Sequence, residues 1–312
     1  MKALTIRRII FWVLFVLCLA PFMSSALALG AGAFVGLILT NPYSAETREW
    51  SGKLLKLAVV GLGFGIAAGE VVRVGAHAAW YTAAAILITF GAGWLLWKLL
   101  RTDRTTTALV TTGTAICGGS AIAAVSPIIR AESQQTGVAL ATVFMLNAVA
   151  LILFPILGRL MGMSESQFGV WAALAIHDTS SVIGAAIDYG GEAVEIATTV
   201  KIMRTLWLIP LVLIIGALQH RKGRAVMPWF VVGFLVAATL RGLFPDLADF
   251  WHLLHTSARR ILVVAIYLIG AGLSRELVAR IGARPMILAV ILWIFISTIT
   301  LGAIHFEIIP VP

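Results

Sequence analysis

Apolar runs long enough to cross a bilayer recur along the whole chain. A transmembrane helix needs about 20 predominantly apolar residues, and we expect such helices near 8–21, 23–40, 54–73, 79–97, 137–157, 194–218, 226–244, 260–278 and 286–304. Two further segments, 105–133 and 167–190, are apolar but interrupted by glycines and polar residues. The pattern predicts an all-α polytopic membrane protein with about nine clear transmembrane helices and two interrupted or re-entrant segments.

The composition supports a membrane setting. Hydrophobic residues make up 60% of the chain and charged residues 12%, and the mean hydropathy is +1.00, whereas soluble domains have about 25% charged residues. No stretch between the expected helices could bury a soluble core, so residues 1–312 are expected to form a single integral membrane domain. The N-terminus resembles a secretory signal, but its apolar sequence continues to Leu39, which favours an uncleaved first helix.

The formal net charge is +9, and the basic residues that produce it are distributed according to the expected helices. With a cytoplasmic N-terminus and one crossing per clear helix, the basic clusters at 2–8, 48–56, 98–104, 221–224 and 275–284 all fall on the cytoplasmic side. This is the positive-inside pattern of a plasma-membrane protein. It places the C-terminus on the periplasmic side and explains the basic charge without a nucleic-acid partner.

The chain contains two pairs of similar segments. LGFGIAAGEVVRVG (62–75) and IGAGLSRELVARIG (269–282) share glycine and arginine positions and, in the expected topology, run in opposite directions. AICGGSAIAA (115–124) pairs with AIHDTSSVIGAA (175–186), and each is followed by a long apolar helix with a proline near its end. Opposed repeats with interrupted helices are typical of secondary transporters.

These repeats predict an internal organisation. We expect scaffold-like helix pairs at 54–100 and 261–305, and core units with broken helices at 105–158 and 167–218. Re-entrant hairpins would make the core units inverted, and membrane crossings would make them parallel; both options remain open. Gly61, Gly65 and Gly69, each four residues apart, form a small-residue stripe that predicts a close approach of another helix, and Gly32 and Gly36 do the same earlier in the chain.

Polar residues gather in the two interrupted segments. The first holds Cys117, Gly118, Gly119 and Ser120, in which the glycines weaken a helix and the serine can cap a new one. The second holds His177, Asp178, Thr179, Ser180 and Ser181, which include good caps that are unfavourable inside helices. A helix that starts inside the membrane presents free N–H groups and a positive dipole end to an anion. The alternative is a structural kink satisfied by neighbouring hydroxyl groups.

Two basic residues are expected deep in the membrane. Lys201 and Arg204 lie three residues apart on one helix face, near the middle of their expected helix. A cation there costs about 3 kcal/mol and marks a pathway or an ion pair. They therefore bind substrate, or Lys201 forms an internal ion pair with Asp178, Glu192 or Glu195; both roles can hold in turn. Asn147, also in mid-helix, either binds substrate or forms an interhelical hydrogen bond.

His177 and Asp178 do not point to a metal site or an enzyme. No suitably spaced Cys, His or Glu partner completes a metal site, and no G-x-S-x-G context accompanies the serines. The two cysteines, Cys18 and Cys117, lie in apolar surroundings and indicate no disulfide framework. We expect no enzymatic activity, no metal and no cofactor. The pair either couples proton movement to transport, or Asp178 caps a helix with His177 as its hydrogen-bonded neighbour.

The combination of ICGGSAIAAVSPIIRAES, AIHDTSSVIGAA and EIATTVKIMRTLWLIP resembles the YeiH-type family of bacterial inner-membrane proteins, to which sulfate export has been assigned. The resemblance implies a plasma-membrane transporter related at fold level to cation–proton antiporters and bile-acid-type carriers, with a scaffold and a moving core. Many relatives carry His-Glu where this chain has His177-Asp178.

Two functions follow from these expectations. The leading one is a secondary transporter of a small anion, such as sulfate or a sulfonate-derived oxyanion, with proton coupling as an option. Lys201, Arg204 and the N–H groups after Gly119 and Asp178 would form its site, with Asp178 competing with the substrate. The alternative is a cation/proton antiporter that uses His177 and Asp178, with Lys201 and Arg204 as structural counter-charges. The expected partners are the ion, protons, the lipid bilayer and, as an option, further copies of the chain.

Overall fold

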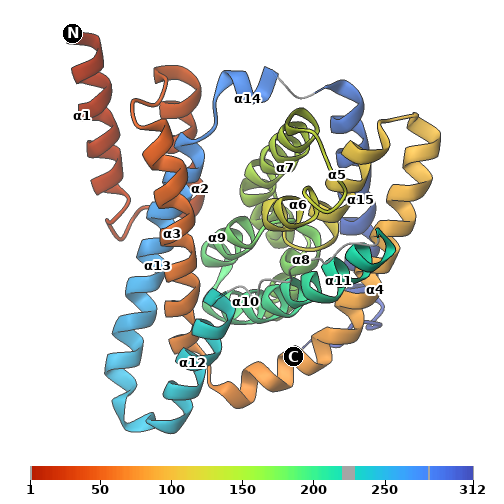
Figure 1. Cartoon of the computed structure of the whole chain (residues 1–312). Helices are drawn as coiled ribbons and strands as arrows, with labels where there is room; N and C mark the ends of the chain where they lie inside the picture. The colour runs from red at the N-terminus through yellow and green to blue at the C-terminus, as the bar shows by residue number, and fades with distance from the viewer. Residues whose placement is uncertain (1, 220–228, 280–281, 312) are drawn as a thin grey trace. The chain divides into compact units, whose positions relative to one another are not determined.

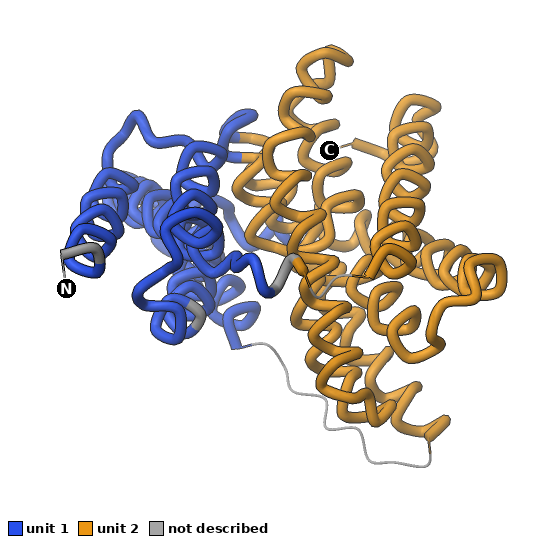
Figure 2. Tube along the Cα trace, turned by 90° about the horizontal axis from the view of Figure 1, so that it is seen from above, with its two compact units in different colours: residues 1–72, 187–191, 228–278 blue, residues 73–186, 192–227, 279–312 orange. Residues whose placement is uncertain are grey.

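The computed structural model describes residues 2–219, 229–279 and 282–311, and those ranges contain helices and turns but no strand. The basic cluster at 221–224, the start of the helix expected at 226 and Arg280 of the repeat lie outside them. The chain forms two compact units (Figure 2). Unit 1 comprises residues 1–72, 187–191 and 228–278, and unit 2 comprises residues 73–186, 192–227 and 279–312.

Within the described residues, five helical stretches are long and apolar enough to cross a membrane (Figure 1). They are α4 (Ala68–Leu100), α7 (Ser133–Leu160), α10 with α11 (Gly191–Leu218), η3 with α13 (Pro245–Ala271) and α15 (Ala283–His305). Two shorter apolar stretches are Ser25–Leu39, which joins α2 (Ser25–Ala33) to the π-helical turn η1 (Phe34–Leu39), and α12 (Trp229–Leu243). The all-helical membrane architecture is confirmed, and the count of nine transmembrane helices stays a prediction.

Helix boundaries differ from the expectation between residues 54 and 97. Helix α3 (Ser44–Leu62) ends before the short turn η2 (Gly63–Gly65), and α4 then runs without a break through 74–78, where two separate helices were expected. Glycines at 61, 63 and 65 weaken the helix, whereas the polar Arg73 and His77 do not end one. The helix expected at 194–218 is also divided, into α10 (Gly191–Leu206) and α11 (Leu208–Leu218), because Pro210 lacks the N–H that would continue the hydrogen-bond ladder.

Unit 1 is built around α13 (Ala248–Ala271), which packs against α2 and α3, while α12 packs against α3. Helices α2 and α13 meet backbone to backbone. A Cβ atom on Gly32 would lie 2.0 Å from the carbonyl oxygen of Tyr267, and one on Gly36 would lie 2.2 Å from that of Leu273. The predicted close approach is confirmed at these two glycines, the second of which lies in η1. It is confirmed also at Gly61 and Gly65, where an added Cβ would lie 2.6 Å from the Cβ of Ala258 and 2.2 Å from Nδ1 of His255. It is wrong at Gly69, where no atom lies within 4 Å of an added Cβ. The remaining helices of unit 1 are α1 (Lys2–Leu17) and α14 (Arg275–Ala279).

Unit 2 contains both interrupted segments as pairs of short helices. The first pair is α5 (Arg104–Ala115) and α6 (Gly119–Val125), and the second is α8 (Glu165–Ala175) and α9 (Thr179–Tyr189). Helix α15 packs against α5, α7 and α8. An aromatic layer joins three of these helices, because the ring of Phe154 stacks 4.3 Å from that of Trp171 and 5.7 Å from that of Trp293.

The expected core units and scaffold-like pairs fall differently on the two compact units. The core units 105–158 and 167–218 fall in unit 2 except for residues 187–191, where α9 ends in unit 1. The scaffold-like pairs 54–100 and 261–305 are each divided between the units, at 72/73 and at 278/279. The repeat relation itself stays a prediction.

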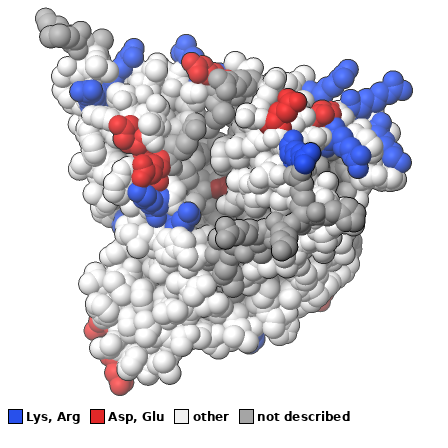
Figure 3. Space-filling view, in the orientation of Figure 1, with Lys and Arg blue, Asp and Glu red and all other residues white. Residues whose placement is uncertain are grey.

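Much of the surface is apolar. Figure 3 shows a visible face on which most of the area carries no Lys, Arg, Asp or Glu, with charged side chains gathered in a few patches. Leu87 and Leu99 on α4 are 72% and 65% exposed. A large exposed apolar surface of this kind is suited to contact with lipid.

Candidate functional site

The two helix breaks of unit 2 touch each other. Gly118 has φ 65° and ψ −126°, a conformation that favours glycine. A Cβ atom at Gly118 would lie 3.0 Å from the Cβ of Asp178 and 3.4 Å from its Cα. The break between α5 and α6 is therefore in direct contact with the break between α8 and α9.

Arg204 of α10 joins the ends of two helices at this contact. Its side chain is fully buried. Its Nε donates to the carbonyl of Ala115 at 2.7 Å and one terminal nitrogen donates to that of Thr114 at 2.9 Å. The other terminal nitrogen donates to the carbonyls of Ala173, at 3.1 Å, and Leu174. One guanidinium thus satisfies carbonyls at the C-terminal ends of both α5 and α8, which their own helices leave unpaired.

Lys201 lies on the same face of α10 and is also fully buried. Its Nζ donates to the carbonyl of Ile176 at 2.7 Å and to that of Ala173 at 3.3 Å. The C-terminal end of a helix carries partial negative charge, so both cations stand where the helix dipole favours them. The structure has no ion pair between either cation and Asp178 within 4.0 Å. The expected ion pair with Asp178 is therefore replaced by contacts with backbone carbonyls.

Asp178 begins α9. Its Oδ2 accepts from the backbone N–H of Ser181 at 3.3 Å and from the hydroxyl of Ser180. This is the capping geometry that satisfies a free N–H group in the first turn of a helix. The capping bond expected of Asp178 is present, whereas the side chain of His177, expected as its hydrogen-bonded neighbour, makes no hydrogen bond. The other carboxylate oxygen of Asp178, Oδ1, is buried without a partner.

Further buried polar atoms near the breaks also lack partners. Asn147 of α7 is 3% exposed, and its Oδ1 accepts from the backbone N–H of His177 at 3.2 Å while its Nδ2 has no partner. His177 is 1% exposed, and neither ring nitrogen is hydrogen-bonded. The buried hydroxyls of Thr114 and Thr198 are unpaired as well. Because buried polar groups are almost always hydrogen-bonded, this cluster has unused capacity for an ion or water.

The remaining sequence-predicted residues fall in different surroundings. Cys117 is buried in the first break, within electrostatic reach of Lys201, Arg204 and Asp178. Gly119 begins α6, where a Cβ would lie 2.9 Å from the ring of Phe144. In the second break, Thr179 is half-buried, and Ser180 and Ser181 are buried at the start of α9.

Ser120 is the exception, because its side chain is exposed. The structure does not bring it into the polar cluster. Within the described ranges, no group of three His, Cys, Asp or Glu residues is placed to hold a metal ion.

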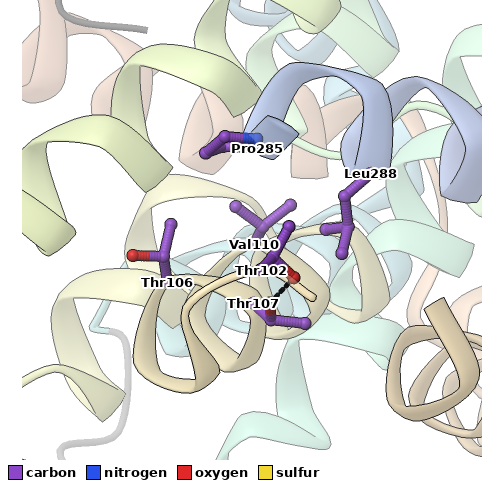
Figure 4. A pocket seen from close by; sticks show the side chains of 6 residues that line it. All are labelled: Thr102, Thr106, Thr107, Val110, Pro285 and Leu288. Carbon is purple, nitrogen blue, oxygen red and sulfur yellow. Dashed lines mark hydrogen bonds between the residues drawn. The ribbon is translucent and has the colours of Figure 1, made fainter. Parts of the chain in front are cut away.

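A small hollow lies at the opposite end of α5 from the break (Figure 4). It is lined by Thr102, Thr106, Thr107 and Val110, with Pro285 and Leu288 from α15. The hydroxyl oxygens of Thr102 and Thr107 are 2.6 Å apart and satisfy each other. No charged side chain lines this hollow, and Thr106 is about 14 Å along the helix from Ala115. The contact between the two breaks is therefore the stronger candidate for an ion site.

Comparison with known proteins supports a membrane assignment for the whole chain. The model of the family described as "Conserved hypothetical protein 698" matches residues 17–289. The chain belongs to this family. It is the YeiH-type family that the sequence motifs indicated, so that resemblance is confirmed.

Relatives of this family carry the name UPF0324 membrane protein. One from Geobacter sulfurreducens is 46% identical over 97% of this chain and 98% of its own length. Another, from Bdellovibrio bacteriovorus, is 46% identical over 97% of this chain and 96% of its own length. A third, from Vibrio parahaemolyticus, is 41% identical over 91% of this chain and 94% of its own length. No solved structure is significantly similar to the chain.

Two buried, unpaired hydroxyl groups, those of Thr114 and Thr198, were not predicted from the sequence. Thr198 stands three residues before Lys201 on the same helix, a spacing that places both on one face. Thr114 lies one residue before the end of α5, and its own carbonyl accepts from Arg204. Helical spacing from Lys201 and from the break could have pointed to both.

Proposed function

We propose that the protein is a secondary transporter of a small anion across the bacterial inner membrane, with the anion site at the contact between the two helix breaks. The observation that supports the proposal most is the balance of charge at this contact. Two buried cations, Lys201 and Arg204, stand beside two broken helices that contribute a single carboxylate, Asp178, to the contact.

The helix ends do not remove this positive excess. Each helix end carries about half an elementary charge, so the C-terminal ends of α5 and α8 together offset about one of the two cations. The N-terminal ends beyond the breaks carry the opposite partial charge and offset Asp178 to a similar extent. About one positive charge therefore remains inside the protein, where an unpaired charge is costly. An anion of one or two charges would neutralise it.

The same contacts suggest how the site could move. Arg204 holds carbonyls of α5 and α8 at once, so the two broken helices are tied together at their contact. A site carried by tied helices can face one side of the membrane and then the other as one body. The sequence has no G-x-x-x-x-G-K-[ST] motif, and an ion gradient, including a proton gradient, is the proposed source of energy.

The proposal is tested by uptake into proteoliposomes. Labelled sulfate, sulfite, thiosulfate and small sulfonates are offered with and without a pH gradient. Saturable uptake of at least one of these anions, absent from protein-free liposomes, is expected. Equal uptake by protein-free and protein-containing vesicles across the panel would refute it.

A second function, cation/proton antiport, is favoured by one observation. The four hydrogen bonds of the Arg204 guanidinium go to backbone carbonyls, as expected of a structural counter-charge, and Oδ1 of Asp178 is an unpaired acceptor for a cation or proton. In the same vesicles this function predicts sodium or proton exchange without any added anion. Asp178→Asn would abolish such exchange, whereas an anion transporter with this change would still bind its anion.

A further inference from the structure

The orientation of the Asn147 side-chain amide is set by its partner. A backbone N–H can only donate, so the Asn147 atom that lies 3.2 Å from the nitrogen of His177 is the amide oxygen. The two N–H groups of Nδ2 are therefore on the other branch of the amide. They are buried and have no partner. Asn147 thus has unpaired donors, and not an unpaired oxygen, beside the second break.

His177 adds to this donor character. A neutral imidazole has one N–H group and an imidazolium has two, so the ring carries a donor in every protonation state. Both ring nitrogens are buried without partners. The ring is also within electrostatic reach of Lys201 and Arg204. Positive charge nearby favours an electron-rich ligand on the ring donor.

We propose that Asn147 and His177 form the recognition pair of the site: their free N–H groups bind oxygens of a small oxyanion and give the site its preference for anions over cations. This inference rests on the proposed anion transport and names the residues and the ligand chemistry that set its selectivity. The amide oxygen of Asn147 accepts from the backbone N–H of His177, so the amide is oriented before the anion arrives. The unpaired hydroxyl of Thr114, whose carbonyl accepts from Arg204, can add a donor, because a hydroxyl rotates to donate.

Asn147→Asp isolates the two donors of Nδ2. The substitution keeps the size of the side chain and an oxygen for the N–H of His177, but replaces the NH₂ group by an acceptor. A hydrogen bond to a charged partner is worth enough for about a 10- to 100-fold loss when it is removed. We expect uptake of the anion transported by the wild type, measured in the same proteoliposomes, to fall by at least about tenfold.

Gln167→Glu is the matched control. It adds the same charge to unit 2 near the start of α8, and a glutamate oxygen can still accept from the backbone N–H of Ser164, as Gln167 does at 3.0 Å. Uptake by this variant should stay within twofold of the wild type. Equal loss in both variants, or wild-type uptake by Asn147→Asp, would overturn the recognition pair while leaving anion transport by the wild type intact. Failure of the wild type to transport any anion of the panel would refute the proposed function itself.

A second pair of variants covers the case in which Asn147→Asp does not fold. His177→Phe keeps a flat ring without a donor, and His177→Gln keeps an N–H donor. We expect His177→Phe to lose uptake and His177→Gln to retain a measurable part of it, with both proteins eluting as the wild type does in size-exclusion chromatography. Equal uptake by the two folded variants would overturn the role of the ring donor.

Discussion

Gly118 offers a direct measure of how closely the two helix breaks are packed. Replacing it with alanine adds a Cβ atom at a backbone φ of 65°, which costs about 1–3 kcal/mol for a residue with a side chain. The added atom would also lie 3.0 Å from the Cβ of Asp178, whereas carbon atoms in contact are about 3.5–4.0 Å apart. Moving the breaks apart by the missing distance costs a further 1–3 kcal/mol or so, as overpacking usually does.

The expected total is a loss of about 2–6 kcal/mol in the free energy of unfolding. For a chain of this size, about 2 °C of melting temperature corresponds to 1 kcal/mol. The apparent Tm of purified Gly118→Ala protein in detergent should therefore fall by about 4–12 °C. Transport should fall as well, because the breaks that form the proposed site would separate.

Substitutions at two other glycines separate the contribution of backbone strain from that of the close contact. Gly162, which follows α7, has the same φ of 65° but no atom within 4 Å of an added Cβ, so Gly162→Ala reports backbone strain alone. Gly137 lies inside α7 with open space around it, and Gly137→Ala should raise stability slightly through helix propensity. If Gly118→Ala lowers the apparent Tm no more than Gly162→Ala does, the close contact between the breaks is refuted.

Three further predictions concern Arg204, unit 1 and the topology. Arg204→Gln should lower the free energy of unfolding by about 3–5 kcal/mol, because it leaves buried carbonyls of two helices without donors, and its apparent Tm should fall more than that of Lys201→Gln; equal shifts would contradict the role of Arg204 in joining α5 and α8. Gly32→Ala should strongly destabilise the protein, since its Cβ would lie 2.0 Å from a backbone oxygen of α13, whereas Gly30→Ala has open space and should not; similar melting curves would argue against the backbone contact. Reporter fusions after residue 222 and at the C-terminus should report opposite sides of the membrane, and the same side for both would exclude the predicted orientation.

Several properties of this protein could be predicted from local sequence because they depend on local chemistry. Long apolar runs predicted a helical membrane protein, since only a helix satisfies its own backbone groups in lipid without a partner strand. Glycine and hydroxyl residues at 118–120 and 178–181 predicted breaks, and α6 and α9 begin at Gly119 and Thr179. The capping role of Asp178 also followed from its residue type, because the cap satisfies an N–H only three residues away.

The partners of Lys201 and Arg204 were decided by the tertiary structure. Helical spacing placed both cations on one face of α10, but their acceptors are carbonyls as far as 90 positions away along the chain. Every residue has a carbonyl, so no residue type in the sequence marks which ones will accept. Only the crossing of α5, α8 and α10 brings those helix ends to the cations. The tertiary structure also decided that Ser120 is exposed and that α4 is continuous. Periodicity indicates which face of a segment is apolar, whereas packing determines what that face contacts.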